Sequence, residues 1–269
     1  MKLETLNLKQ FIIIITFTVA LCCANAQERL FSDTPCEYIT TDIQGNVFLV
    51  HGSNLDMLPA DGSKPLNYSE PTYGNIAQVD AGIASKILVF YRESGTIILL
   101  NSELSPVGNP LSLFNKSLMT VSLAAMGNPN KIVLYDEANQ DLLITDLSLN
   151  SINRTHITFP GDFHPTDMQV VPEHRIALLD TIHGICLFDF FGTFEKEIPI
   201  PGVKAMQLMK DQLIYQKDNK LYQYIIPTAS SSMSIEEIDI QLPIIERFHF
   251  FHNLFYYIDD RNIPYKIDL

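Results

Sequence analysis

Short apolar stretches recur along the chain, each with a polar residue before it and an acidic or turn-forming residue at its end. They are rich in Val, Ile, Leu and aromatic residues, which favour a pleated, buried surface, so each stretch is predicted to be a β-strand. Successive copies begin roughly 40 residues apart. The six stretches are Asn46–Val50, Lys86–Tyr91, Lys131–Asp136, Arg175–Asp180, Gln212–Lys217 and Asn253–Asp259.

Further strands flank these stretches. A tight link that contains Gly, Asn or Asp follows each copy, and these residues tolerate the left-handed backbone of a short hairpin. The hairpin partners are predicted at Ile97–Asn101, Leu142–Asp146, Ile185–Asp189, Leu221–Ile225 and Ile263–Asp268. Another strand precedes each copy, with starts near Tyr38, Gln78, Val121, Thr166, Lys204 and Glu246.

A period near 40 residues with three or four antiparallel strands per unit predicts an all-β, six-bladed β-propeller. No window of a dozen residues carries sustained helical periodicity, and residues 229–238, which come nearest to it, lie where an outer strand or loop belongs. The last unit lacks an outer strand. Residues Glu28 to Ser32 can supply it, so we expect the ring to be closed by pairing of the N- and C-terminal strands.

The first 26 residues predict a secretory signal peptide. Lys2 and Lys9 precede an apolar run from Phe11 to Cys23, and Ala24-Asn25-Ala26 supplies the small residues of a cleavage site. Residues 27–269 would then form a single β-propeller domain, which we expect in the periplasm, with secretion as the alternative. A lipid anchor at Cys22 or Cys23 is a further alternative to cleavage after Ala26.

Composition narrows the classes of partner. The formal net charge of −13 disfavours ligands held by phosphate neutralisation, so no nucleic-acid partner is expected. No segment after residue 26 has the length and apolar character of a membrane-spanning helix. Cys36 and Cys186 fall in the first and fourth of six repeats, on opposite sides of the ring. They are therefore predicted to be two free, buried thiols rather than a disulfide.

The segment Ile39–Val50, with the similar patterns at Ser122–Asp136 and Asp167–Asp180, resembles the inner-strand, turn and second-strand run of six-bladed propellers of the NHL-like class. The signal that ends in Ala-Asn-Ala before Gln27 resembles those of exported Bacteroidota proteins. The first resemblance implies the propeller fold. The second implies an exported protein of a group in which an outer-membrane secretion translocon has soluble periplasmic partners, including a plugging subunit.

Five polar residues near the inner strands are candidates for a channel-mouth site. Calcium-dependent propeller lactonases project acidic and amide residues into their channel, because a hard cation prefers oxygen ligands, so calcium is the one cofactor considered. A plainer interpretation exists, since Asp at a strand exit caps a turn and a loop His is usually satisfied locally. The candidates are Glu37, Asp42, Asp80, His164 and Asp167.

Other constellations give no catalytic or metal site. His249 and His252 are three residues apart on a predicted strand, so their rings point to opposite faces and no zinc site is predicted. The chain has no Gly-x-Ser-x-Gly elbow and no Gly-rich phosphate loop. Cys186 precedes Leu187-Phe188 and is interpreted as a buried strand thiol. No catalytic residue is therefore assigned.

Two kinds of modification site occur. The N-glycan acceptor pattern appears at Asn67, Asn115 and Asn153, and it matters only for a eukaryotic protein. Asp180-Thr181-Ile182 resembles the short O-glycan acceptor of Bacteroidota and places Thr181 on a predicted hairpin turn.

The repeats without a catalytic constellation predict an exported, non-enzymatic propeller that binds another protein as a scaffold subunit. The specific hypothesis is a plug-like periplasmic accessory of an outer-membrane complex or of a type 9 protein secretion complex. The alternative is a calcium-dependent propeller hydrolase or lactonase.

Overall fold

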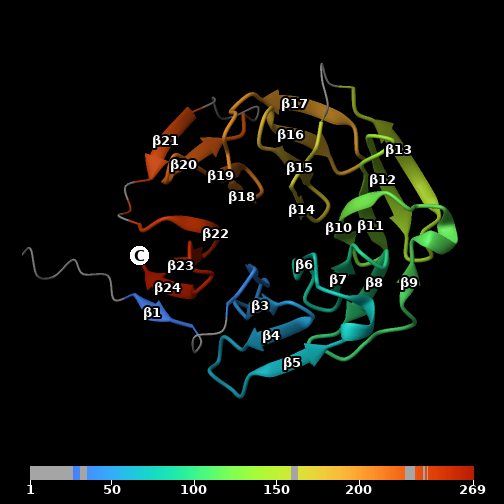
Figure 1. Ribbon diagram of the computed structural model, residues 1–269. Helices are drawn as coiled ribbons and strands as arrows, with labels where there is room; N and C mark the ends of the chain where they lie inside the picture. Colours follow the sequence, from blue (N-terminus) through green and yellow to red (C-terminus); the bar gives the residue numbers. More distant parts are fainter. Residues whose placement is uncertain (1–26, 31–34, 159–162, 228–233, 239, 241) are drawn as a thin grey trace, which may run out of the picture.

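The computed structural model describes residues 27–30, 35–158, 163–227, 234–238, 240 and 242–269. These residues form six four-stranded antiparallel sheets arranged as blades around a ring (Figure 1). The predicted six-bladed β-propeller is therefore confirmed. The predicted signal peptide, residues 1–26, lies outside the described residues.

The innermost strand of each blade lies at the predicted place. Blades 1 to 6 begin in turn with β2 (Tyr38–Thr41), β6 (Gln78–Asp80), β10 (Val121–Asn128), β14 (Asp167–Val171), β18 (Ala205–Leu208) and β22 (Ile245–Phe251).

The apolar repeat of the sequence is the second strand of each blade. These strands are β3 (Val47–His51), β7 (Ile87–Tyr91), β11 (Lys131–Asp136), β15 (Arg175–Asp180), β19 (Gln212–Lys217) and β23 (Leu254–Asp259). Their hairpin partners are β4 (Asn54–Leu58), β8 (Thr96–Leu100), β12 (Asp141–Asp146), β16 (Gly184–Asp189), β20 (Lys220–Ile225) and β24 (Pro264–Asp268).

The outer strands are more variable in length. They are β5 (Leu66–Ser69), β9 (Leu111–Ser112), β13 (Ser151–His156), β17 (Phe194–Ile198), β21 (Ser234–Ile238) and β1 (Glu28–Arg29). Two 3-10 turns, η1 (Pro71–Tyr73) and η2 (Phe114–Lys116), lie in the connections that follow β5 and β9.

The ring closes as predicted. β1 pairs with β24, with Glu28 opposite Lys266 and Arg29 opposite Tyr265. The Glu28 carboxylate lies 3.1 Å from Lys266 Nζ, and the Leu30 amide donates to the Pro264 carbonyl. Blade 6 therefore combines the two ends of the described chain, and Figure 1 shows β1 beside β24.

Six apolar clusters fill the spaces between neighbouring blades, one at each junction. Alternate residues of one strand enter different clusters: Val89 packs toward blade 1, whereas Leu88 and Phe90 pack toward blade 3. Both faces of each middle strand are thus buried, which explains why the repeats are continuously apolar rather than alternating.

The acidic residues at strand ends cap turns. Asp146 accepts hydrogen bonds from the amides of Ser148 and Asn150, both at 2.8 Å, and Asp189 does the same for Phe191 and Thr193. Backbone and side-chain hydrogen bonds from Asn150 lower the pKa of Asp146. The recurrent acidic exit in the sequence is therefore a turn-forming feature of the blades.

Cys36 and Cys186 are both free and buried, as predicted. Burial raises the pKa of each thiol to about 12, so neither is activated as a nucleophile. Across the described ranges, no helix is long and apolar enough to cross a membrane.

Candidate functional site

A central channel with a volume of about 260 Å³ runs along the axis of the ring. Five of the six inner strands line it, namely β2, β6, β14, β18 and β22. The inner edge of each sheet turns unpaired backbone N–H and C=O groups toward this channel. Such groups are costly to bury unless they find partners.

Glutamine side chains supply many of those partners. Gln169 accepts from the Leu208 amide at 2.8 Å and donates to the Met206 carbonyl at 2.6 Å, which ties β14 to β18. Gln207 bonds the amide and the carbonyl of Phe250 at 2.6 and 2.8 Å, which ties β18 to β22. A carboxamide has the donor and acceptor of a peptide group, so it replaces a missing strand neighbour.

A third glutamine spans a wider gap. Gln78 on β6 accepts from the Ala124 amide of β10 at 3.2 Å and donates to the Met168 carbonyl of β14 at 2.8 Å. To reach Met168 on blade 4, the Gln78 side chain of blade 2 passes the small Ala124 of blade 3, which lies between them. We infer that small side chains on β10 allow this reach, since β10 itself does not line the cavity.

Asp80 and His249 hold the register position that Gln169 and Gln207 hold on their own strands. Asp80 accepts from the Met126 amide at 2.8 Å, and His249 Nδ1 lies 3.1 Å from Thr41 Oγ1 on β2. Burial lowers the pKa of the His249 imidazole to about 4, so it is neutral at pH 7. This level of the channel is a belt of side-chain links between blades.

A charged level lies next to this belt. Arg247 Nη1 is 3.8 Å from Asp167 Oδ2, and its guanidinium lies over the Tyr38 ring at 5.3 Å. The pair reaches across Ala205, the small residue at the equivalent position of β18. Burial raises the pKa of Asp167 and of Asp80, and burial followed by the charge of Asp167 raises the pKa of Tyr38.

The structure separates the five acidic and histidine candidates of the sequence. Asp80 and Asp167 line the channel, together with Asp42 at the end of β2. The Asp42 carboxylate is occupied by a turn, because it accepts from Gln44, Asn46 and the Asn46 side chain at 2.7 to 2.9 Å.

Two candidates lie elsewhere. Glu37 accepts from the Gly52 amide at 2.9 Å, and exposed His164 pairs with Glu137 at 3.1 Å. Within the described part of the chain, no group of three or more His, Cys, Asp and Glu side chains is gathered as a metal would need. His249 faces the channel and His252 lies in the exposed turn after β22, so their rings do not converge.

The O-glycan candidate lies on a surface turn. Thr181 is exposed in the β15–β16 hairpin, and the neighbouring Ile182 side chain is 71% exposed. The preceding Asp180 is buried, which opposes ionisation, but hydrogen bonds from His183, His164 and Ile182 lower its pKa. That carboxylate therefore holds the turn.

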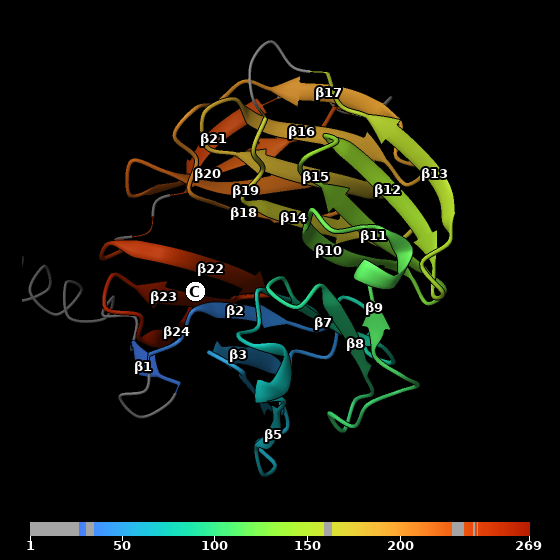
Figure 2. The ribbon, with the colours of Figure 1, turned by 45° about the vertical axis from the view of Figure 1, so that its right-hand side comes forward.

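A second hollow lies at the outer rim, between β13 of blade 3 and the β16–β17 hairpin of blade 4. Figure 2 shows the strands of these two neighbouring blades. This rim groove has a volume of about 400 Å³. It is lined by Thr155, His156, Ile157, Thr158, Phe188, Phe194 and Glu197. Phe194 packs edge-on against Phe188 with 5.7 Å between ring centroids, yet remains 49% exposed, and Phe191 beside it is 66% exposed.

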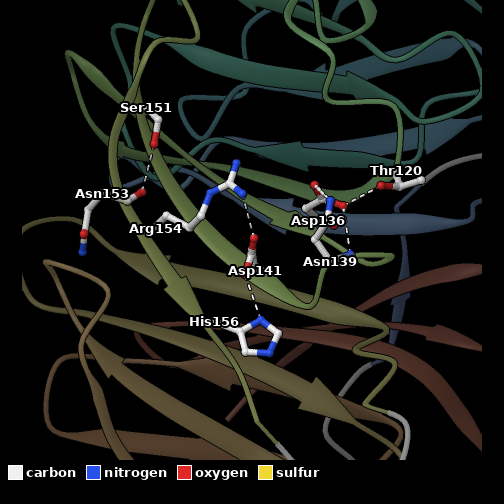
Figure 3. A network of polar contacts seen from close by, with 8 residues as sticks. All are labelled: Thr120, Asp136, Asn139, Asp141, Ser151, Asn153, Arg154 and His156. Carbon is white, nitrogen blue, oxygen red and sulfur yellow. Dashed lines mark hydrogen bonds and ion pairs between the residues drawn. The ribbon is translucent and has the colours of Figure 1, made fainter.

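The strand β13, which forms one wall of the groove, is held by a carboxylate of the neighbouring strand β12. Figure 3 shows the Asp141 carboxylate between two side chains of β13, with Arg154 Nη1 and His156 Nδ1 each at 3.1 Å. Asp141 is buried, whereas Arg154 and His156 are exposed. On the groove side, the side-chain amide Nδ2 of Asn153 donates to the Phe191 carbonyl at 2.6 Å. These links hold β13 in place. Its outer edge has no neighbouring strand, because β13 is the last strand of its sheet.

Sequence reasoning missed both the glutamine links and the rim groove. One signal was present for the first: Gln169 and Gln207 follow a Met in inner strands of similar pattern, Asp167-Met168-Gln169 and Ala205-Met206-Gln207. The groove had no comparable signal, because its walls come from strands of two different blades, β13 and the β16–β17 hairpin, whose sequences show no shared motif.

The comparisons with known proteins bear on the fold. No protein-family model matches the chain, and no curated protein matches it in sequence. Many solved structures are similar in shape. The WD40 domain of Neurospora crassa Pan2 has a TM-score of 0.63 at 10% identity, covering 90% of this chain and 95% of that one.

Two other similar structures differ in their biology. Virginiamycin B lyase from Staphylococcus aureus has a TM-score of 0.62 at 15% identity, over 91% of this chain and 98% of the lyase. A chain of the mitotic checkpoint complex has a TM-score of 0.58 at 10% identity, over 86% of this chain and 75% of its own. At such identities, these likenesses support the β-propeller fold and nothing finer.

Proposed function

We propose that this protein is a non-enzymatic binding propeller whose rim groove receives an extended segment of a partner protein. The observation that carries the proposal is the exposed outer edge of β13 beside an apolar groove. Among the described residues, β13, with six residues, is the longest of the outer strands. A partner segment that pairs with this edge would gain backbone hydrogen bonds, and its apolar side chains would enter the groove.

The groove has the composition of an anchor site. Phe194 offers exposed aromatic surface above the buried Phe188, and aromatic residues are enriched where interfaces gain most of their energy. Phe191 extends this surface toward the β16–β17 turn. Propellers among the similar structures include a subunit of a multiprotein complex, the mitotic checkpoint complex, which makes a binding role a reasonable one for this architecture.

The cellular setting is also a proposal. The signal-like residues 1–26 support export, and the periplasm is the compartment we propose, with a role as accessory, plug-like subunit of an outer-membrane or type 9 secretion complex. The resemblance of the repeats to the NHL-like class supports the propeller fold, and the resemblance of the signal to those of exported Bacteroidota proteins supports export. Glycosylation of Thr181, on its exposed turn, would be compatible with this compartment.

Comparative affinity purification tests the proposal. Tagged wild type, Phe194→Ser and Ile182→Ser are each recovered from the native envelope, and the co-purified proteins are quantified. Ile182 is a matched control, because it is another exposed apolar residue on a different surface. The groove is supported as the binding site if the recovery of one partner protein falls at least tenfold with Phe194→Ser and is unchanged with Ile182→Ser. Equal recovery with all three proteins contradicts it.

A further inference from the structure

We propose that the rim groove selects a partner segment with a basic side chain, arginine or lysine, and holds that side chain between the Phe194 ring and the Glu197 carboxylate. The inference rests on the proposed function, because it concerns the same groove, and it adds the chemistry of the occupant. Both residues belong to the wall that β17 forms. An aromatic ring beside a carboxylate suits an alkyl stem that ends in a cation.

A β-bulge places these two side chains on the same face of β17. Residues three apart on a regular strand point to opposite faces. Here the register shifts, so that Phe194 lies opposite Phe188 and Glu197 lies opposite Cys186, two residues earlier on β16. Phe188 and Cys186 both belong to the apolar cluster between blades 3 and 4. Phe194 and Glu197 therefore both face the groove, separated by about 7 Å along the strand, which a long basic side chain can bridge.

Glu197 is the acidic side chain of the groove, and within the described part of the chain its carboxylate has no ion-pair or hydrogen-bond partner. Its neighbour on the strand differs, because the Glu195 carboxylate lies 2.6 Å from Arg175 Nε. The charge of Glu197 acts on the floor of the groove: burial, and after it this charge, raises the pKa of Cys186 to about 12. Glu197 thus remains available to a cation from outside.

The basic side chains of the two walls are engaged elsewhere. On β13, Arg154 and His156 both contact the Asp141 carboxylate at 3.1 Å. On β17, Lys196 Nζ lies 2.9 Å from the Tyr224 hydroxyl of blade 5. None of them neutralises Glu197, and the formal net charge of −13 also favours a basic partner over an acidic one.

The backbone of β13 fixes where the partner segment would pair. The Ile157 amide donates to the Gln140 carbonyl at 2.8 Å, so Ile157 and alternate residues before it turn their backbone groups toward β12. The N–H and C=O groups of Arg154 and His156 therefore point to the free edge. A segment that pairs with them places the side chain opposite Thr155 on the face of the groove.

Three pentapeptides that differ only in their central residue test this chemistry. In acetyl-Val-Thr-X-Thr-Val-amide, X is arginine, citrulline or glutamate, and citrulline has nearly the shape of arginine without its charge. NMR titration of the 15N-labelled protein follows the amides of Arg154 and His156. The arginine peptide should shift them with a Kd on the order of millimolar, typical of a short flexible ligand. The citrulline peptide should bind at least fivefold more weakly, and the glutamate peptide more weakly still.

Two outcomes of this titration contradict the inference in different ways. Equal Kd values for the arginine and citrulline peptides at these amides would overturn the basic side chain and leave the groove as a binding site. No shift with any of the three peptides would overturn the proposed function as well.

Variants of Glu197 locate the charge that is read. Glu197→Gln should give the arginine and citrulline peptides the same Kd. Glu236→Gln, at an exposed glutamate of the outer strand β21 in blade 5, is the matched control and should keep the wild-type difference. Glu197→Lys should reverse the preference, so that the glutamate peptide binds more tightly than the arginine peptide. The wild-type order of affinities in Glu197→Lys would overturn the inference.

Affinity purification from the native envelope separates the inference from the proposed function. A partner whose recovery falls at least fivefold with both Phe194→Ser and Glu197→Gln, and is unchanged with Glu236→Gln, supports both. A partner that is lost with Phe194→Ser but recovered at the wild-type level with Glu197→Gln would keep the groove as the partner site and overturn the basic side chain.

Discussion

The inner and outer edges of the blades both leave backbone groups without a strand partner, but the structure satisfies these groups differently at the two edges. Both edges end a sheet and leave backbone N–H and C=O groups without a strand neighbour. At the inner edge, side chains of adjacent blades fill that role, as Gln207 does for Phe250. At the outer edge, β13 is anchored through Asp141 from its own blade, and its free side stays open beside the rim groove.

This difference separates stability from recognition. Interactions at the axis are buried and hold one blade to the next, so their loss should lower the free energy of unfolding. Those at the rim are exposed, and exposed contacts contribute little to stability. The same repeat therefore provides a rigid centre and an accessible periphery, and substitutions at the two places should have effects of different size and kind.

The largest expected effect is that of Gln207→Leu. The substitution leaves both the amide and the carbonyl of Phe250 unpaired in a buried setting, which should lower the free energy of unfolding by roughly 2–5 kcal/mol. Urea denaturation measures it. Gln44→Leu, in an exposed turn, is the control and should change stability by less than about 0.5 kcal/mol. A similar small loss for both variants would show that the inner edge is not held by these links.

The second effect concerns pH. Burial holds the pKa of His249 at about 4 against 6.5 for an ordinary imidazole, so the unfolded chain takes up the proton first on acidification. The corresponding stability is present above pH 6.5 and is lost between pH 6.5 and 4, amounting to about 3 kcal/mol. Denaturant titrations across this window should show a flatter pH dependence in His249→Gln than in the wild type. Exposed His252→Gln should keep the wild-type slope, and an equal slope in all three proteins would contradict the prediction.

The sequence predicted the ring well, because the same weak strand pattern recurs six times at a regular spacing. Strands β11, β15 and β19 begin and end at the predicted residues, and even the closing pair, β1 with β24, was expected from a missing outer strand. Residues 229–238 came nearest to helical periodicity and were expected to be an outer strand or loop. Ser234–Ile238 form the outer strand β21, and residues 229–233 lie outside the described residues. For that segment, the tertiary structure overrode the local helical propensity.

The third effect lies at the closure of the ring. Removal of residues 27–30 deletes β1 and exposes the edge of β24. Because β1 contributes two paired residues, the free energy of unfolding should fall by roughly 1–2 kcal/mol. The melting temperature should be several degrees lower. Light scattering should also show more association, since an open edge pairs with other chains. An unchanged melting temperature would mean that the ring is closed without this strand.

The smallest expected effect on stability is that of Phe194→Ser at the rim. The ring is 49% exposed and contacts Phe188 from outside the core, so the free energy of unfolding should change by less than about 1 kcal/mol. The variant should instead change partner binding. A loss as large as that of Gln207→Leu would show that the rim groove belongs to the core.

The candidate sites were harder to predict than the fold. Asp80 and Asp167 were selected for their place near inner strands, and both line the channel. Glu37 and His164 share that sequence context but lie outside the channel, where Glu37 accepts from Gly52 and His164 pairs with Glu137. Strand position fixes which end of a blade a residue occupies. It does not show which side chain is already satisfied, as Asp42 is by Gln44 and Asn46.

Site-specific photocrosslinking from the rim groove tests the central claim most directly. A photoreactive phenylalanine analogue is placed at Thr155 in the groove, and at Ile182 on the exposed β15–β16 turn as the control. Illumination of the native envelope should give one dominant adduct with a protein partner from position 155, and Phe194→Ser in the same chain should abolish it. Adducts that form equally from position 182, or that persist in Phe194→Ser, would contradict the assignment of the groove as the partner-binding site.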